Sequence, residues 1–295
     1  MMNKLVVMVG PTAVGKSALA VRLAKKFNGE VVSADSRQVY KGLTIGSGKI
    51  TRKEMGGIPH HLLDVVSPKR RFTVAQYCSR ARKAMASIFR QGKLPILVGG
   101  SPFYIYSVVD GWSIPEVKPN HALRKNLEKL SVEELFLKLK KLDPARASTI
   151  EVKNKRRLIR ALEIILKTKK PVPKLQKQPL PYSVLFLGIK KSPAELKKRI
   201  ALRLKKRFKQ GMIREVEKLH QQGISWRRLE ELGLEYRFIA QYLQGKSSFL
   251  EMKQKLQKAI EDFSRRQMSW FKKDKRIHWV KNQTEAEATI KNLIS

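Results

Sequence analysis

The sequence predicts an α/β protein: a parallel sheet flanked by helices and interrupted by an inserted, all-helical domain. Short apolar runs bounded by turn residues alternate with helical segments, which is the pattern of a parallel sheet. A phosphate-binding motif directly follows the first apolar run. A lysine-rich stretch with prolines at its ends then breaks the alternation. We therefore expect a core of residues 1–112 and 183–295, with the insertion at 113–182 between them.

The first apolar run, residues 5–9, predicts a buried strand. The chain continues as G-x-x-x-x-G-K-S and then with helical periodicity as far as Asn28, which is the sequence context of a P-loop. In a P-loop, backbone N–H groups surround a phosphate at the N-terminal end of the helix. The core is therefore expected to be P-loop NTPase-like. The predicted loop consists of Gly10, Pro11, Thr12, Ala13, Val14, Gly15, Lys16 and Ser17.

Two side chains of this loop have expected roles. Lys16 would place its ammonium on the terminal phosphate, and the Ser17 hydroxyl would ligate Mg²⁺. The alternative is a chance match in a glycine-containing turn, but the strand before it and the helix after it favour the P-loop. The motif alone leaves open which diphosphate or triphosphate is bound.

The composition indicates a polyanionic partner. The 295 residues include 63 Lys and Arg against 24 Asp and Glu, a net charge of +39, although 42% of the residues are hydrophobic. Such an excess destabilises a fold through self-repulsion, so binding to a polyanion such as nucleic acid explains it. A generally basic proteome or an adaptation for solubility is the alternative.

A single cysteine, Cys78, excludes an internal disulfide and any zinc site that needs several cysteines. No apolar stretch approaches the roughly 20 residues of a membrane span. We therefore expect a cytoplasmic protein without a membrane segment.

Asp35 follows a second short apolar run, Val31–Val32, which predicts another strand. Ligands of open α/β sheets bind at the carboxyl ends of strands, so Asp35 should lie on the same rim as Lys16. Its carboxylate could ligate Mg²⁺ or act as a general base. Alternatively, it only caps the next helix.

The P-loop G-P-T-A-V-G-K-S and the following S-A-D-S-R-Q-V-Y at 33–40 resemble the tRNA dimethylallyltransferase family, in its bacterial type without a zinc finger. Further blocks agree in order along most of the chain. They are H-H-L-L-D at 60–64, L-P-I-L-V-G-G-S-P-F-Y at 94–104, N-K-R-R-L-I-R-A-L-E at 154–163, L-G-L-E-Y-R at 232–237 and R-R-Q at 265–267. The sequence departs from the family pattern at Ile50, Ser101 and Pro102–Phe103.

This resemblance implies transfer of a dimethylallyl group from dimethylallyl diphosphate to N6 of adenosine 37, in tRNAs that read codons beginning with U. It also implies Mg²⁺ as cofactor, a monomer, and an insertion that clasps the anticodon stem-loop. The implied catalytic residues are Asp35, Lys16, Arg203 and Ser101, with Asp35 as base and Arg203 on the pyrophosphate. The implied tRNA-binding residues are Asp35, Ser36, Arg37, Gln38, Ser101, Arg124, Arg156, Arg157, Arg160, Arg237, Arg266 and Gln267.

Basic residues recur on three predicted helices. In the insertion, Arg156 and Arg160 are one turn apart and could bridge successive phosphates, or could only form a solvated face. A helix over 193–222 should carry an apolar stripe and a cationic stripe that includes Arg203 and Arg207. A C-terminal helix over 251–273 should leave 265–267 available to RNA, and 276–280 predicts a last strand.

Adjacent His60 and His61 could ligate a metal, but neighbouring side chains diverge, so hydrogen bonding is the favoured interpretation. A small-molecule or nucleotide kinase remains the alternative function, because kinases share the P-loop core. A non-enzymatic or ATPase RNA-binding module is a third possibility, but it would leave Asp35 and Arg203 without a role. ATP hydrolysis is also disfavoured because the strand at 94–98 ends in Gly99–Gly100 without the acidic residue that it uses.

Overall fold

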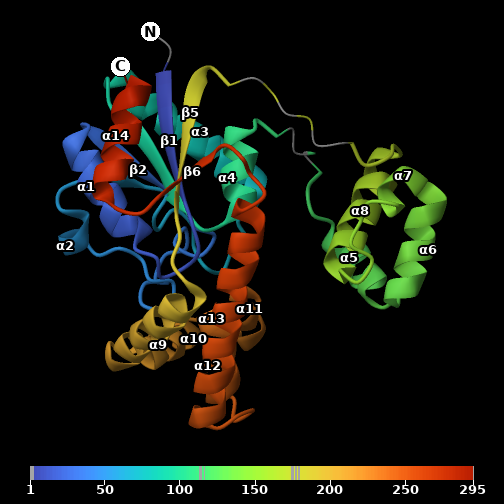
Figure 1. The fold of residues 1–295 in the computed structure, drawn as a ribbon. Helices are drawn as coiled ribbons and strands as arrows, with labels where there is room; N and C mark the ends of the chain where they lie inside the picture. Colours follow the sequence, from blue (N-terminus) through green and yellow to red (C-terminus); the bar gives the residue numbers. More distant parts are fainter. Residues whose placement is uncertain are drawn as a thin grey trace. The chain divides into compact units, whose positions relative to one another are not determined.

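The structure, a computed structural model, describes residues 3–112, 115, 117–173, 176, 178 and 180–294. The chain forms two compact units (Figure 1). One comprises Met1–Asp110 with Pro179–Ser295, and the other comprises Gly111–Gln178. The predicted boundaries at 113 and 182 thus differ from the observed ones at 111 and 178, and Ser113 lies outside the described residues. The second boundary falls earlier because Tyr182 is already in the sheet, paired with Asn3.

The core unit contains a parallel sheet, as the sequence predicts. Its order is β3-β2-β4-β1-β5-β6 in the described part of the chain, and every pairing is parallel. The strands are β1 (Asn3–Val9), β2 (Gly29–Ala34), β3 (His60–His61), β4 (Leu94–Gly99), β5 (Tyr182–Ile189) and β6 (Ile277–Val280). The carboxyl ends of β2, β4 and β1 are therefore neighbours at one edge of the sheet.

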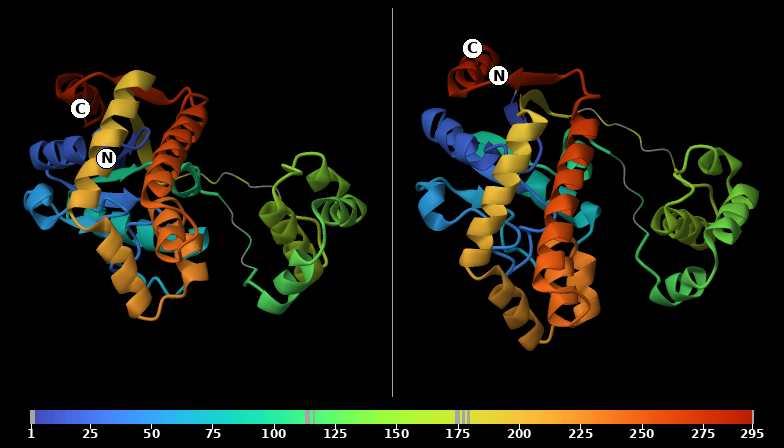
Figure 2. Two further views of the ribbon diagram at one scale, coloured as in Figure 1. Left: turned by 90° about the horizontal axis from the view of Figure 1, so that it is seen from below. Right: turned by 60° about the horizontal axis from the view of Figure 1, so that its bottom comes forward.

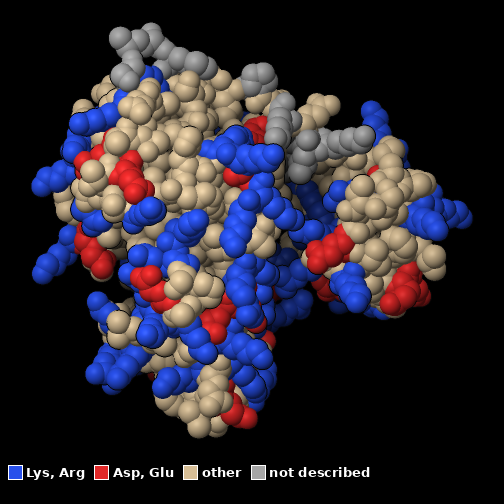
Figure 3. Space-filling model, viewed as in Figure 1, with Lys and Arg blue, Asp and Glu red and all other residues tan. Residues whose placement is uncertain are grey.

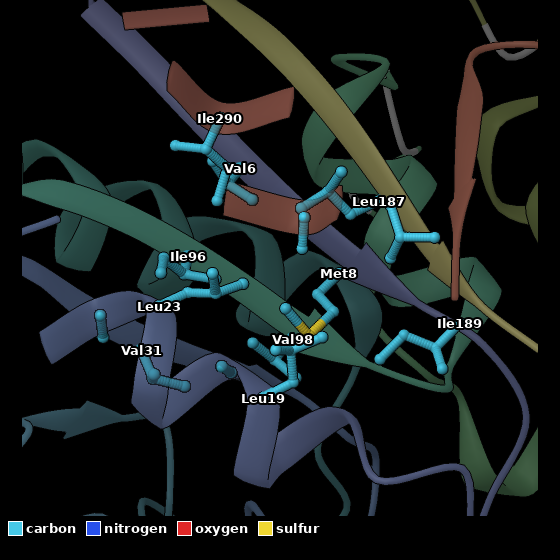
Figure 4. Close-up of a cluster of buried hydrophobic side chains, with 14 of the residues drawn as sticks. Val6, Met8, Leu19, Leu23, Val31, Ile96, Val98, Leu187, Ile189 and Ile290 are labelled. Carbon is cyan, nitrogen blue, oxygen red and sulfur yellow. The ribbon is translucent and has the colours of Figure 1, made fainter. Parts of the chain in front are cut away.

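Helices cover both faces of this sheet. Alternate residues of β1, Val6 and Met8, pack with Leu19 and Leu23 of α1 (Lys16–Lys26) in one buried cluster (Figure 4). The helix α14 (Gln283–Ile294), which the sequence analysis did not predict, joins the same cluster. On the other face, α3 (Val74–Arg90) contacts β2 and β4, and α4 (Pro102–Val109) contacts β4.

The remaining core helices form a bundle beyond the sheet. The long helices α9 (Pro193–Lys209) and α13 (Phe249–Phe271) lie side by side (Figure 2). The predicted single helix over 193–222 is wrong, because α9 ends before Gly211, which adopts a left-handed φ of 92° and starts α10 (Met212–Gln221). The short helix α2 (Arg52–Met55) precedes β3, and α11 (Trp226–Leu232) and α12 (Leu234–Leu243) complete the bundle.

The insertion has its own hydrophobic core. Its helices are α5 (His121–Glu128), α6 (Val132–Leu142), α7 (Pro144–Ala147) and α8 (Lys155–Thr168). Leu135 and Leu139 of α6 pack against Leu158 and Leu162 of α8, and all four are essentially buried. Leu158 and Leu162 are four residues apart, so they lie on the same face of α8. Among the described helices of the whole chain, none is long and apolar enough to cross a membrane.

Candidate active site

The predicted P-loop, residues 10–17, is called the phosphate loop below. It connects β1 to α1, and its glycines allow its backbone geometry. Gly10 has a φ of 143°, and a Cβ there would lie 2.4 Å from the carbonyl oxygen of Ile189. Gly15, with a φ of 98°, is the N-cap of α1. A side chain is excluded at Gly10 by the close carbonyl oxygen and disfavoured at Gly15 by its positive φ, so both positions require glycine.

Lys16 folds back onto its own loop. Its Nζ donates hydrogen bonds to the carbonyl oxygens of Gly10, at 2.9 Å, and Pro11, at 2.7 Å. Desolvation in the pocket wall, together with the nearby charge of Arg203, lowers the pKa of the Lys16 ammonium to about 7, whereas Asp35 opposes the shift. A bound polyphosphate would supply the missing counter-charge and raise that pKa.

Lys16 is therefore expected to react with an acylating reagent at pH 7.5 faster than the exposed Lys25 of the same helix. With a pKa of about 7, roughly three-quarters of Lys16 is neutral at pH 7.5, against about 0.1% of an ordinary lysine. Peptide mass analysis after brief labelling measures both sites. Pyrophosphate should protect Lys16 and leave Lys25 unaffected, and equal labelling of the two lysines without pyrophosphate would contradict the expectation.

Arg203 reaches the loop from α9. Its Nη2 donates a 2.7 Å hydrogen bond to the Thr12 hydroxyl, 191 residues away in sequence. Burial, and then the charge of Arg207, lower the pKa of Arg203 to about 10, so the guanidinium remains cationic at neutral pH. The structure thus brings the arginine implied by the family resemblance to the phosphate loop.

Asp35 lies at the end of β2, as its position after that strand predicts. Its Oδ1 accepts hydrogen bonds from the backbone N–H groups of Arg37, at 2.8 Å, and Gln38, at 3.3 Å. The helix-capping alternative is wrong, because residues 36–39 form turns and the next helix, α2, begins at Arg52. The contact closes a turn instead. It occupies only one oxygen, because Oδ2 accepts no hydrogen bond from the described residues, so a chemical role remains open to it.

Ser101 follows β4 and contacts the Asp35 turn. Its hydroxyl accepts a 3.2 Å hydrogen bond from the backbone N–H of Ser36. Pro102, a departure from the family pattern, is the first residue of α4, where a missing N–H leaves no bond unmade. This departure is therefore compatible with the fold.

One cavity of about 590 Å³ brings these residues together. Lys16, Ser17, Asp35 and Arg203 line it, but Ser101 does not. The lining also has an apolar part that the sequence analysis did not assign to the site. That part includes Val21, Ile50 and Phe263.

Two residues predicted to face RNA or solvent are buried instead. Gln267 is not on the helix surface: it is 3% exposed, its Oε1 accepts from the Thr12 N–H and its Nε2 donates to the Gly100 carbonyl. It lines the cavity described above, and its contact with RNA stays a prediction. Arg207, placed in the cationic stripe, is also buried and donates to Glu235 and to the Gly46 carbonyl. Polar side chains on a helix were read as solvent-facing, whereas packing between elements buries these two.

Several other predicted tRNA contacts have internal partners. In the insertion, the buried Glu163 accepts from Arg124, Arg160 and the N–H of Asn120, and these bonds lower the pKa of Glu163 to about 2 against the opposing effect of its burial. Arg157 pairs with Glu151. Their contact with RNA stays a prediction, as it does for the exposed Arg156, Arg237 and Arg266.

The histidine pair makes hydrogen bonds, as favoured from the sequence. The ring Nδ1 of His60 is 2.8 Å from the Ile58 carbonyl oxygen, and the ring Nε2 of His61 is 2.6 Å from a carboxylate oxygen of Glu30. Within the described residues no group of three or more His, Cys, Asp or Glu side chains could hold a metal ion.

The fold and the cavity define an α/β protein in which the loop between a buried parallel strand and a helix shares one cavity with the carboxylate of Asp35. Residues 38–274 match the family model described as IPP transferase. Over 300 residues, the chain is 43% identical to tRNA dimethylallyltransferase 1 of Geotalea daltonii, covering 100% of this chain and 96% of that one. It is 39% identical to tRNA dimethylallyltransferase of Anoxybacillus flavithermus, covering 94% and 90%. The chain therefore belongs to the IPP transferase family and is a transferase.

Solved structures agree with this assignment. The full-length tRNA isopentenylpyrophosphate transferase of Bacillus halodurans superposes with a TM-score of 0.73 at 34% identity, over 99% of this chain and 95% of that one. A eukaryotic dimethylallyltransferase acting on tRNA gives a TM-score of 0.78 at 28% identity, over 91% and 69%. These relatives favour the transferase interpretation over the kinase alternative.

Proposed function

We propose that this protein transfers a dimethylallyl group from dimethylallyl diphosphate to N6 of adenosine 37, in tRNAs that read codons beginning with U. The observation that carries the proposal is that residues of the P-loop, Arg203 and Asp35 line the same cavity. Its apolar part, with Val21, Ile50 and Phe263, suits a short hydrocarbon next to a diphosphate.

Departure of the diphosphate is the step that the loop side of the cavity assists. As the allylic C–O bond breaks, its electron pair leaves with pyrophosphate and positive charge develops on carbon. Lys16, the loop N–H groups and Arg203 would all interact more strongly with the leaving group in the transition state than in the ground state. Mg²⁺ fits the oxygen donors present and would be held by the Ser17 hydroxyl together with diphosphate oxygens. When bound, it supplies charge neutralisation for the leaving group.

The acceptor amine needs a base, because an exocyclic adenine nitrogen is a weak nucleophile. The N6–C bond forms as the C–O bond breaks, and Asp35 accepts the proton that N6 loses. The target base must leave its stack to reach the cavity, which costs less in an anticodon loop than in a duplex. Ser36, Arg37, Gln38 and Ser101 are proposed to hold the flipped base and its neighbours.

Ligand protection against thermal unfolding tests the donor. Dimethylallyl diphosphate with Mg²⁺ should raise the melting temperature, since a ligand at a hundredfold its dissociation constant adds about 2.7 kcal/mol of stability. Pyrophosphate should give a smaller rise, and dimethylallyl alcohol, which lacks the diphosphate, none. Protection by ATP but not by dimethylallyl diphosphate would support the kinase alternative instead.

Affinity for tRNA is expected to fall by orders of magnitude between about 50 and 200 mM salt, because several phosphates are contacted and their counterions released. Lys and Arg crowd the face of the core that α9, α10 and α13 form (Figure 3). Filter binding of unmodified tRNA at four salt concentrations measures the slope. The Arg156→Gln variant should reduce that slope by about one. If the affinity of the unsubstituted protein for tRNA does not change with salt concentration, the basic surfaces do not bind the phosphates of the RNA.

A further inference from the structure

The loop before Ile50 is held by an unusual contact. The backbone N–H groups of three consecutive residues, Thr44, Ile45 and Gly46, converge on the carboxylate of Glu215 in α10. The N···O distances are 3.0, 2.6 and 3.0 Å. Successive N–H groups that point to one place form an anion-binding concavity. Here a side chain of the protein, 169 to 171 residues away, supplies the anion.

Buried polar groups from α12 and α9 complete this contact. The Tyr236 hydroxyl donates to Glu215 at 2.9 Å and accepts from the Ser47 N–H at 3.1 Å. Arg207 donates to the Gly46 carbonyl oxygen at 3.0 Å. It passes so close that a Cβ on Gly48 would lie 1.7 Å from its Nη2. The loop therefore has one well-defined position on the helices.

The same loop forms part of the cavity wall. Ser47 and Gly48 of this loop line the cavity. The Gly48 carbonyl accepts a 3.2 Å hydrogen bond from Gln38 Nε2, and the Gln38 N–H in turn donates to Asp35 Oδ1. A continuous set of contacts thus runs from Glu215 through the loop to the proposed base.

We propose that Glu215 is a positioning residue that holds residues 44–48 as the acceptor-side wall of the cavity. This inference rests on the proposed function, because it assigns Glu215 to the acceptor half of that reaction. Glu215 touches neither substrate. Its carboxylate fixes the loop, the loop fixes Gln38, and Gln38 borders the turn that carries Asp35. The phosphate loop, held by Arg203 and Gln267, is independent of Glu215 in the contacts of the described residues.

The Glu215→Ala variant tests the proposal. Its kcat is expected to fall about 10- to 100-fold, as for other small misplacements at a reacting centre. The KM for dimethylallyl diphosphate should stay within about twofold, because the phosphate loop is unaffected. Formate should restore part of the lost kcat, since three free N–H groups and the Tyr236 hydroxyl would again surround an anion. The exposed Glu217 lies on the same helix, so Glu217→Ala is the matched control and should be fully active without rescue.

Three results would overturn the inference. One is unchanged kcat in Glu215→Ala, another is a raised donor KM at unchanged kcat, and the third is a lost kcat that formate does not restore. If Glu215→Ala fails to fold, Tyr236→Phe decides, because it removes one hydrogen bond to the carboxylate. Tyr236→Phe should lower kcat less than Glu215→Ala does and should leave the KM for the donor unchanged. A raised donor KM or an unchanged kcat would count against the proposal. An inactive unsubstituted protein would instead overturn the proposed function, which separates the two failures.

Discussion

Replacing Asp35 by asparagine is expected to lower kcat by about a hundredfold or more, while tRNA affinity changes little. Removal of a positioned base typically costs a factor of 10² to 10⁴. Asparagine is the informative substitution because its Oδ1 can still accept from the N–H groups of Arg37 and Gln38, so the turn is kept. Alanine removes that acceptor as well and should also disturb the turn.

Single-turnover kinetics with saturating tRNA and donor measure the chemical step of Asp35→Asn, and filter binding measures its affinity for tRNA. Glu217→Gln, an exposed carboxylate-to-amide change on α10, is the matched control. A variant that loses tRNA binding but retains the rate of the chemical step would show that Asp35 binds RNA and does not act as the base.

Replacing Arg203 by lysine is expected to lower kcat/KM for the donor by about a hundredfold, the size of effect seen when one preorganised contact to developing negative charge is lost. Lysine keeps the charge but lacks the planar fork that can donate to Thr12 and to a phosphate oxygen together. Because the leaving group carries the developing charge, kcat/KM for the donor should fall, whereas the affinity for tRNA should stay unchanged.

Inhibition by pyrophosphate gives a second measure of Arg203→Lys, and its inhibition constant should rise. Arg199 is one turn earlier on α9, exposed and paired with Glu195, so Arg199→Lys is the matched control. If pyrophosphate inhibits Arg203→Lys as strongly as the unsubstituted protein, while tRNA binding is weakened, Arg203 contacts RNA and not the donor.

Local patterns explain why much of the core was predictable. The glycines and Lys16 lie within eight residues, and their spacing alone specifies the loop between a strand and a helix. Asp35 could be placed near Lys16 because both follow strands of one parallel sheet, whose carboxyl ends share an edge. The contact of Arg203 with the loop was implied only by the family resemblance, since nothing local connects α9 to Thr12.

Long-range packing decided what the sequence could not predict. Gln267, Arg207 and Arg203 all lie on helices with many basic residues, and the pattern does not distinguish those that face solvent from those buried against a loop. Glu215 gave no local signal, because its partners are N–H groups of a loop whose shape depends on that contact. The break between α9 and α10 did have a local signal, because a glycine such as Gly211 inside a helical pattern often ends the helix.

Transfer of a dimethylallyl group to a tRNA adenosine can be detected in the product itself. The most direct measurement is to incubate the purified protein with Mg²⁺, unmodified tRNA and dimethylallyl diphosphate, digest the tRNA to nucleosides and determine their masses. The expected product is an adenosine that carries one added isopentenyl unit, formed with one equivalent of pyrophosphate and absent when the donor is omitted. Unchanged nucleosides from tRNA that the protein still binds would contradict this expectation.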